Sequence, residues 1–129
     1  MILASGKFDG LHAGHVRYLQ AARNLSTGET LRVLIAPDSY IEATRKRPAF
    51  WSQSDRAHTV YALACVDAVT LSVTDDGAQE IRDLQPRIYV KGPDWMDRLP
   101  LSVRQACHDV GAEIVFVNTV GRHAREARR

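Results

Sequence analysis

Two histidines that bracket a glycine are the residues of this sequence best suited to chemistry. His12 and His15 end the run GKFDGLHAGH, residues 6–15, which leads directly into an amphipathic segment. Gly14 permits a close approach of backbone to a ligand, and a helix that begins here offers free N–H groups and the positive end of its dipole. The turn therefore suits phosphate binding, and the two imidazoles add further hydrogen-bond donors.

Donors held beside a phosphate would assist the transfer of a nucleotidyl group. Attack on the α-phosphate of a nucleoside triphosphate builds negative charge on the equatorial oxygens and on the departing pyrophosphate, so fixed donors lower the barrier. A nucleophile that already carries negative charge would need only positioning and charge neutralisation. We expect no covalent intermediate and no catalytic serine, cysteine or general base.

The length and composition predict one globular domain over residues 1–129. Hydrophobic residues make up 45% and charged residues 25%, as in average soluble domains. No apolar run approaches the ~20 residues that span a bilayer, and the first residues lack the features of a signal peptide. We therefore expect a cytoplasmic protein without a membrane partner. Cys65 and Cys107 lack metal-ligand spacing, so no protein metal site is predicted.

The charge distribution gives little support to nucleic-acid binding. The formal net charge is +2, and the surplus lies at the C-terminal end in Arg122, Arg125, Arg128 and Arg129. A basic chain end is more often solvated than bound to a phosphate polymer. Nucleic acid is therefore not an expected partner.

Strand-length apolar segments alternate with helix-length segments along the whole chain, which predicts an α/β fold. This pattern is typical of a Rossmann-like, doubly wound parallel sheet of about five strands in a single domain. Strands are expected at residues 2–5, 31–36, 69–73, 87–91 and 114–117, and helices at residues 15–24, 54–65, 79–84 and 100–110. Gly111 is the expected C-cap of the last helix.

The residues with unusual chemistry fall in the connections that follow the strands. Ligands of such sheets bind outside the carboxyl ends of the strands. The corresponding connections are residues 6–15, 37–53, 92–99 and those from 118 onward. They hold or adjoin the candidate functional residues His12, His15, Lys46, Arg56, Lys91, Asp94 and Trp95.

The pattern Gly6-x-Phe8-Asp9-x-x-His12-x-Gly14-His15 resembles the signature of the cytidylyltransferase-like nucleotidyltransferase superfamily, whose HxGH motif binds the triphosphate. Two branches are similar over nearly the whole chain: glycerol-3-phosphate cytidylyltransferase, and the adenylyltransferase domain that makes ADP-heptose. Residues 12–19 and 62–69 are like the heptose branch. The spacing from Arg47 to Arg56, the pair Asp94-Trp95 and the chain length are more like the glycerol enzyme.

The resemblance implies roles for the matching residues. It implies catalytic contacts to phosphate from His12, His15, Lys46 and Arg56, with Lys7, Arg45 or Arg47 as alternatives to Lys46. It implies nucleotide contacts from Gly6, Lys7, Phe8, Asp9, Gly14, Lys91, Gly92, Asp94, Trp95 and Thr119. Trp95 either stacks near the ligand or covers the underside of its loop. The family also needs Mg²⁺, which bridges phosphate oxygens and requires no dedicated protein cage.

The function that these observations favour is transfer of CMP or AMP from CTP or ATP to a phosphorylated small molecule, with release of pyrophosphate. The acceptor would be glycerol 3-phosphate or a sugar phosphate, and the similarity of Asp94-Trp95 to the glycerol branch slightly favours CMP. Family members are commonly dimers, so a homodimer is expected, with Phe50 and Trp51 as candidate contacts.

The end of the chain departs from the family pattern. Where the family has a Ser/Thr-rich turn that binds the β- and γ-phosphates, this sequence has Gly121 followed by Arg122-His123-Ala124-Arg125. Arginines would still attract the phosphates as charge partners, with a different geometry. The alternative function is a nucleotide-binding protein of the same fold that has lost transferase activity.

Overall fold

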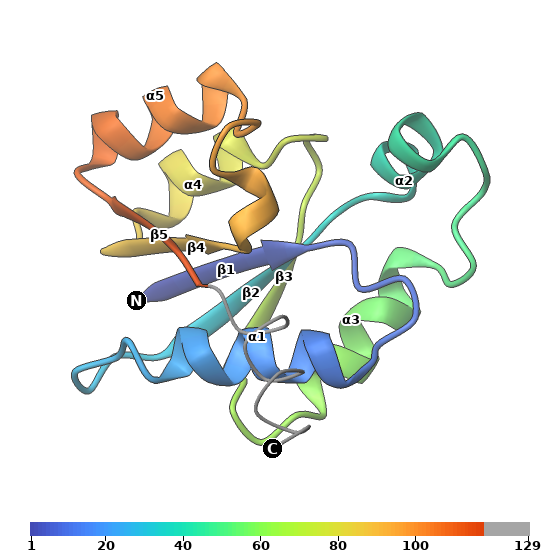
Figure 1. Ribbon diagram of the computed structural model, residues 1–129, viewed down its shortest axis with the longest axis horizontal. Helices are drawn as coiled ribbons and strands as arrows, with labels where there is room; N and C mark the ends of the chain where they lie inside the picture. The colour runs from blue at the N-terminus through green and yellow to red at the C-terminus, as the bar shows by residue number, and fades with distance from the viewer. Residues whose placement is uncertain (118–129) are drawn as a thin grey trace, which may run out of the picture.

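The fold is a five-stranded parallel sheet with helices on both faces (Figure 1). The computed structural model describes residues 1–117. The strands are β1 (Ile2–Gly6), β2 (Leu31–Ile35), β3 (Ala68–Leu71), β4 (Ile88–Lys91) and β5 (Glu113–Phe116), in the spatial order β3-β2-β1-β4-β5. All four pairs of neighbouring strands are parallel. The predicted doubly wound sheet is confirmed.

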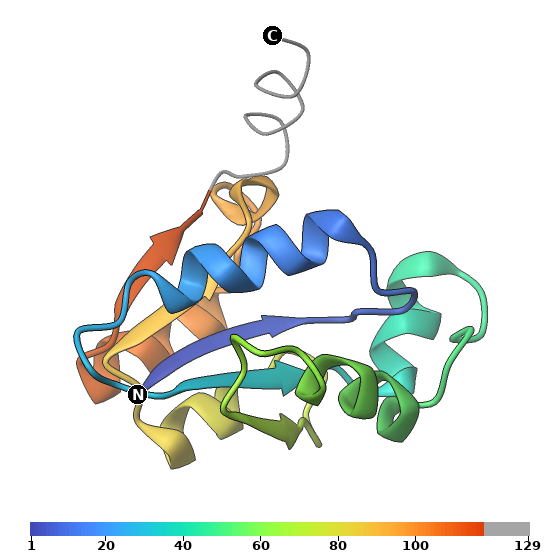
Figure 2. The same cartoon turned by 90° about the horizontal axis from the view of Figure 1, so that it is seen from below.

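Two helices cover each face of the sheet (Figures 1 and 2). The helices α1 (Ala13–Arg23) and α3 (Gln53–Tyr61) share one core with Ile2 and Ala4 of β1. The helices α4 (Ala78–Leu84) and α5 (Leu101–Val110) share the other core with Leu3. Successive side chains of a strand point to opposite faces, so β1 contributes to both cores. Within residues 1–117, no helix has the length and apolar character needed to span a membrane.

The helix α2 (Asp38–Arg45) lies in a segment where the sequence predicts only an irregular connection. Pro37 precedes the helix in an extended conformation, and the carboxylate of Asp38 in the first turn favours the helix dipole. Only Ile41 of this helix is buried. The helix therefore lacks the apolar periodicity by which a core helix is recognised.

Three predicted elements differ from the structure by more than one residue at an end. The first helix begins at Ala13 rather than at residue 15, because the side chain of His12 caps it. The second predicted helix ends at Tyr61 rather than near residue 65, and its N-cap is Ser52. The third strand ends at Leu71 rather than at residue 73. The backbone N–H groups of residues 73 and 74 donate to the Glu80 carboxylate instead of to a neighbouring strand.

The strands β1 and β4 separate at the carboxyl edge of the sheet, and Tyr18 of α1 bridges them. Ala4 and Val90 are the last residues paired between the two strands. The Tyr18 hydroxyl lies 3.0 Å from the carbonyl oxygen of Ser5 and 2.8 Å from that of Val90, so its proton is shared between both strands. The strand order reverses between β1 and β4, which is where sheets of this kind bind ligands.

Candidate active site

A cavity of about 530 Å³ opens at this fork between β1 and β4. Its walls come from the segments that follow β1, β2, β3 and β4. Its lining includes eleven of the predicted site residues: Gly6, Lys7, Phe8, Asp9, His12, Gly14, His15, Lys91, Gly92, Asp94 and Trp95. Segments far apart in sequence thus meet at one edge of the sheet, as the sequence predicts.

His12 and His15 form the N-terminal cap of α1. The backbone N–H of Gly14 donates to Nδ1 of His12 at 3.0 Å, and the backbone N–H of His12 donates to Nδ1 of His15 at 3.2 Å. The two rings stack with their centroids 3.8 Å apart. An Nδ1 atom that accepts a hydrogen bond carries no proton, so the proton of each neutral ring is on Nε2. Within residues 1–117 no group accepts from either Nε2, so each ring keeps one N–H donor for a ligand.

His15 is held in its neutral form. Burial, followed by the nearby His12 and Arg45, lowers the pKa of His15 to about 4. The ring also lies edge-on to the ring of Phe8, with centroids 5.3 Å apart. Phe8 has a φ of 53°, an unfavourable conformation for a bulky residue, and its ring is buried in the core. The surrounding packing thus fixes both the orientation and the protonation of His15.

Asp9 ties the basic segment 45–47 to the histidine turn. Its carboxylate accepts hydrogen bonds from the Arg47 guanidinium and from the backbone N–H groups of Phe50 and Trp51, each at 3.0 Å. Burial alone would raise the pKa of Asp9, but these hydrogen bonds outweigh it and the pKa is lowered. Asp9 is therefore a charged anchor, a more specific role than the loop-shaping one expected from the sequence.

Arg45 and Arg47, rather than Lys46, bring positive charge to the cavity. Lys46 is the C-cap of α2, with a left-handed φ of 59°, and its exposed side chain is not part of the cavity lining. The prediction of a phosphate contact at Lys46 is therefore transferred to the alternatives, Arg45, Arg47 and Lys7, all of which line the cavity.

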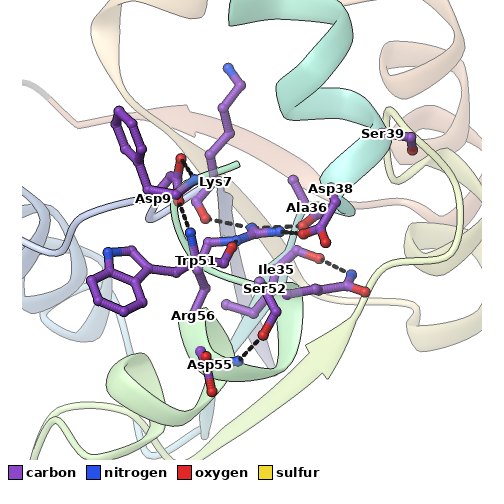
Figure 3. A network of polar contacts seen from close by, with 12 residues as sticks. Lys7, Asp9, Ile35, Ala36, Asp38, Ser39, Trp51, Ser52, Asp55 and Arg56 are labelled. Carbon is purple, nitrogen blue, oxygen red and sulfur yellow. Dashed lines mark hydrogen bonds and ion pairs between the residues drawn. The ribbon is translucent and has the colours of Figure 1, made fainter. Parts of the chain in front are cut away.

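Arg56 is a buried structural residue and does not line the cavity. Its guanidinium donates to the carbonyl oxygens of Lys7, Ala36 and Trp51 at 2.7, 2.8 and 3.0 Å, and to the carboxylate of Asp38 at 2.6 Å (Figure 3). It thereby joins the connections after β1 and β2 to the start of α3. The predicted phosphate contact is corrected to a positioning role, because these partners occupy the guanidinium.

Lys91 and the histidine turn lie on opposite faces of the sheet, with the cavity between them. Its position in β4, two residues after Tyr89, places it on the face covered by α4 and α5. Its Nζ donates to Oγ of Ser5 at 3.1 Å and lies 4.1 Å from the ring centre of Trp95. Burial, followed by the charge of Lys7, lowers the pKa of Lys91 to about 7.

Several cavity residues carry no signal that sequence reasoning recognised. They are Ser5, Tyr18, Tyr40, Asp75, Asp76 and Tyr89. Ser5 ends the first predicted strand, and no recognised motif assigns a role to the three tyrosines, so only their tertiary neighbours identify them. Trp95 faces the cavity with lysines near its ring, which adds a cation–π role to the two that the sequence left open. Thr119 and the segment Arg122-Arg125 lie outside the described residues.

Within residues 1–117, no group of three or more His, Cys, Asp or Glu side chains is arranged to hold a metal ion.

Phe50 and Trp51, the candidate dimer contacts, are 68% and 57% exposed, and the expected dimer stays a prediction. The Phe50 ring is covered on one side by the Arg47 guanidinium, at 3.7 Å from the ring centre.

Comparison with known proteins is consistent with this site. Residues 3–123 match the family model described as cytidylyltransferase-like. The chain is 42% identical over 104 residues to the D-beta-D-heptose 1-phosphate adenylyltransferase of Bordetella bronchiseptica, a match that covers 78% of this chain and 62% of that protein. It is 40% identical over 97 residues to the bifunctional protein HldE of Trichlorobacter lovleyi, covering 74% of this chain and 19% of that protein. The matches thus span less than two thirds of either relative.

A solved structure shares the fold. The lipopolysaccharide core biosynthesis protein from Thermoplasma volcanium superposes with a TM-score of 0.72 and 23% identity, over 92% of this chain and 94% of that one. At this level of identity the likeness concerns the fold alone.

Proposed function

This chain belongs to the cytidylyltransferase-like family, and from that premise we propose that it transfers AMP from ATP to the phosphate of a sugar phosphate, with release of pyrophosphate. The observation that carries the proposal is the pair of Nε2 donors of His12 and His15. They lie at the start of α1 and share one cavity with the cationic side chains of Arg45 and Arg47. Such an arrangement suits a triphosphate rather than an uncharged ligand.

The proposed chemistry needs only fixed donors and charge. The Nε2–H groups would donate to oxygens of the α-phosphate as the acceptor phosphate attacks in line and pyrophosphate leaves. Because His15 has a pKa of about 4, it stays neutral at physiological pH and acts as a donor rather than as a proton source. Arg45 and Arg47 would neutralise charge on the leaving group, held in place through the contact between Arg47 and Asp9.

Mg²⁺ is part of the proposal as an ion carried by the phosphate oxygens of the nucleotide. It would supply charge neutralisation at these oxygens and keep several of its waters. The carboxylates of Asp75 and Asp94 line the cavity and offer hard oxygen ligands of the kind that Mg²⁺ prefers. Both side chains are exposed, so either can approach a bound ion without loss of a structural contact in the core.

ATP and a sugar phosphate are proposed as substrates because the most similar relatives described above include a heptose 1-phosphate adenylyltransferase. The sequence slightly favours CMP through Asp94-Trp95, so CTP is the competing donor and glycerol 3-phosphate the competing acceptor. Pyrophosphate release should be measured with ATP and CTP, each combined with D-β-D-heptose 1-phosphate and with glycerol 3-phosphate. Turnover with ATP and the heptose phosphate supports the proposal, and turnover with CTP alone contradicts the adenylyl assignment.

The role of the histidine pair is tested by replacement of His15. We expect His15→Ala to lower kcat by about 10²–10³, the effect of losing one preorganised donor. The loss of its cap to the His12 N–H costs only ~1 kcal/mol of folding stability. His108→Ala is the matched control, since His108 lies exposed on α5. Near-normal turnover of His15→Ala would refute the mechanism, and nucleotide binding without turnover in the wild type would favour the non-catalytic alternative.

A further inference from the structure

Lys91 is a buried cationic side chain with no carboxylate partner in residues 1–117. It is 9% exposed and lines the cavity, yet no acidic oxygen of this part of the chain lies within 4 Å of its Nζ. Its one hydrogen-bond partner in the described chain is Oγ of Ser5, which is itself 2.8 Å from the Tyr89 hydroxyl. An ammonium group has three donors, so two remain for a ligand.

The groups that face Lys91 make the site suitable for an anion. Lys7, from the connection after β1, repels the ammonium, and Tyr89 stays a neutral phenol because burial raises its pKa. Trp95 covers Lys91 from η1 (Pro93–Trp95), and its ring also has Lys7 and Arg98 nearby, at 5.8 and 5.5 Å. The carboxylates that line the same cavity, from Asp9, Asp75, Asp76 and Asp94, do not pair with Lys91. Lys91 thus has a cationic neighbour and no paired carboxylate within residues 1–117.

The proposed reaction requires two anionic positions in one cavity. The triphosphate and the acceptor phosphate must lie on opposite sides of the α-phosphorus for an in-line displacement. The structure holds two groups of cationic side chains: Arg47 with the histidine turn, on the side of α1, and Lys91 with Lys7 beneath Trp95, on the side of α5, while Arg45 lies near both His15 and Lys7. The first group suits the triphosphate, which leaves the second for the nucleophile.

We propose that Lys91, with Ser5 and Lys7 beneath Trp95, binds the phosphate of the acceptor, and that Lys91 takes up a proton as this phosphate binds. The inference rests on the proposed function and assigns the acceptor side of its site. In the empty cavity, burial and Lys7 keep Lys91 partly neutral, with a pKa of about 7. A phosphate dianion supplies the missing counter-charge and favours the ammonium. Above neutral pH the proton comes from solvent and adds to the Nζ lone pair, with no other bond made or broken.

Protonation coupled to binding has a measurable pH dependence. If the phosphate binds only the ammonium form, the apparent affinity scales with the fraction protonated. With a free pKa of about 7, that fraction falls about tenfold between pH 6 and pH 8. Lys91→Arg keeps a permanent charge and should remove this component, leaving only the pH dependence that comes from ionisation of the phosphate itself, whereas Lys91→Met removes the charge altogether.

The test is calorimetric titration of the protein with inorganic phosphate at pH 8, in Tris and in HEPES, whose ionisation enthalpies differ. A non-hydrolysable ATP analogue is present at saturation to fill the triphosphate position. We expect the wild type to take up close to one proton per phosphate, Lys91→Arg to bind without uptake, and Lys91→Met to bind at least tenfold more weakly. Unfolding curves of all three proteins show that each is folded.

Three results would overturn the inference. They are equal phosphate affinity in the wild type and Lys91→Met, equal proton uptake in the wild type and Lys91→Arg, or a selective loss of affinity for the ATP analogue in Lys91→Met. The last result would assign Lys91 to the nucleotide. None of these readouts requires turnover, so failure of the transferase proposal, seen as absence of pyrophosphate release, is distinguishable from failure of this one.

Discussion

Replacement of Arg56 should destabilise the fold rather than weaken ligand contacts. The side chain is fully buried, and it donates to three backbone carbonyls and to Asp38. Arg56→Met removes the charge and leaves these carbonyls without a donor, at about 1 kcal/mol or more each. Breaking a buried ionic network costs about 3–5 kcal/mol, which agrees with that sum. Against a typical total of ~5–15 kcal/mol, the variant loses a large part of its stability.

Urea unfolding followed by circular dichroism measures this effect. Arg56→Lys is the second variant, because it keeps the charge but lacks the planar set of donors, and we expect it to lose at least ~2 kcal/mol. Arg82→Met is the matched control, since its ion pair with Asp109 is exposed to solvent and contributes little to stability. The reasoning would be wrong if the free energies of unfolding of both Arg56 variants lay within ~1 kcal/mol of the wild-type value while their affinity for ATP fell tenfold. That result would mean that Arg56 contacts the nucleotide.

Three further predictions follow from single contacts. The pKa of His15 is about 4 in the folded protein against a usual 6.5, so the unfolded chain binds more protons between pH 6.5 and pH 4. The free energy of unfolding should therefore fall as the pH drops through this range. His15→Gln should lose this part of the pH dependence, and identical pH dependence of stability in the wild type and His15→Gln would contradict the prediction. Gly6→Ala places a Cβ 2.8 Å from the Phe8 ring and should cost about 1–3 kcal/mol in urea unfolding, whereas Gly92→Ala meets open space and should cost less than ~0.5. Asp9→Asn should weaken ATP binding in calorimetry, because Arg47 loses its charged anchor; an affinity equal to that of the exposed-site control Asp55→Asn argues against the anchor.

The fold was predictable because its signals are local. Apolar strand segments separated by helical ones predict a parallel α/β sheet. The C-cap at Gly111, with a φ of 74°, was predictable because glycine is the residue that most readily adopts the left-handed conformation at a helix end. The helix α2 escaped prediction because only one of its residues is buried. The end of β3 escaped because Glu80, several residues later, binds the backbone at that point. Both depend on contacts that the pattern of a single segment does not contain.

Sequence alone determined where the site lies and what class of ligand it suits. The HxGH turn, the sheet topology and the strand ends place His12, His15 and Lys91 at one edge. Tertiary structure decided which cations face the cavity. Arg56 and Lys46 have the right residue types, but the Arg56 guanidinium donates to buried carbonyls, and Lys46 caps a helix outside the cavity lining. Arg45, Arg47 and Lys7 line the cavity. The physical reason is that a charged side chain has the same chemistry wherever it occurs, and only its three-dimensional neighbours determine whether its donors are free and whether it keeps its proton.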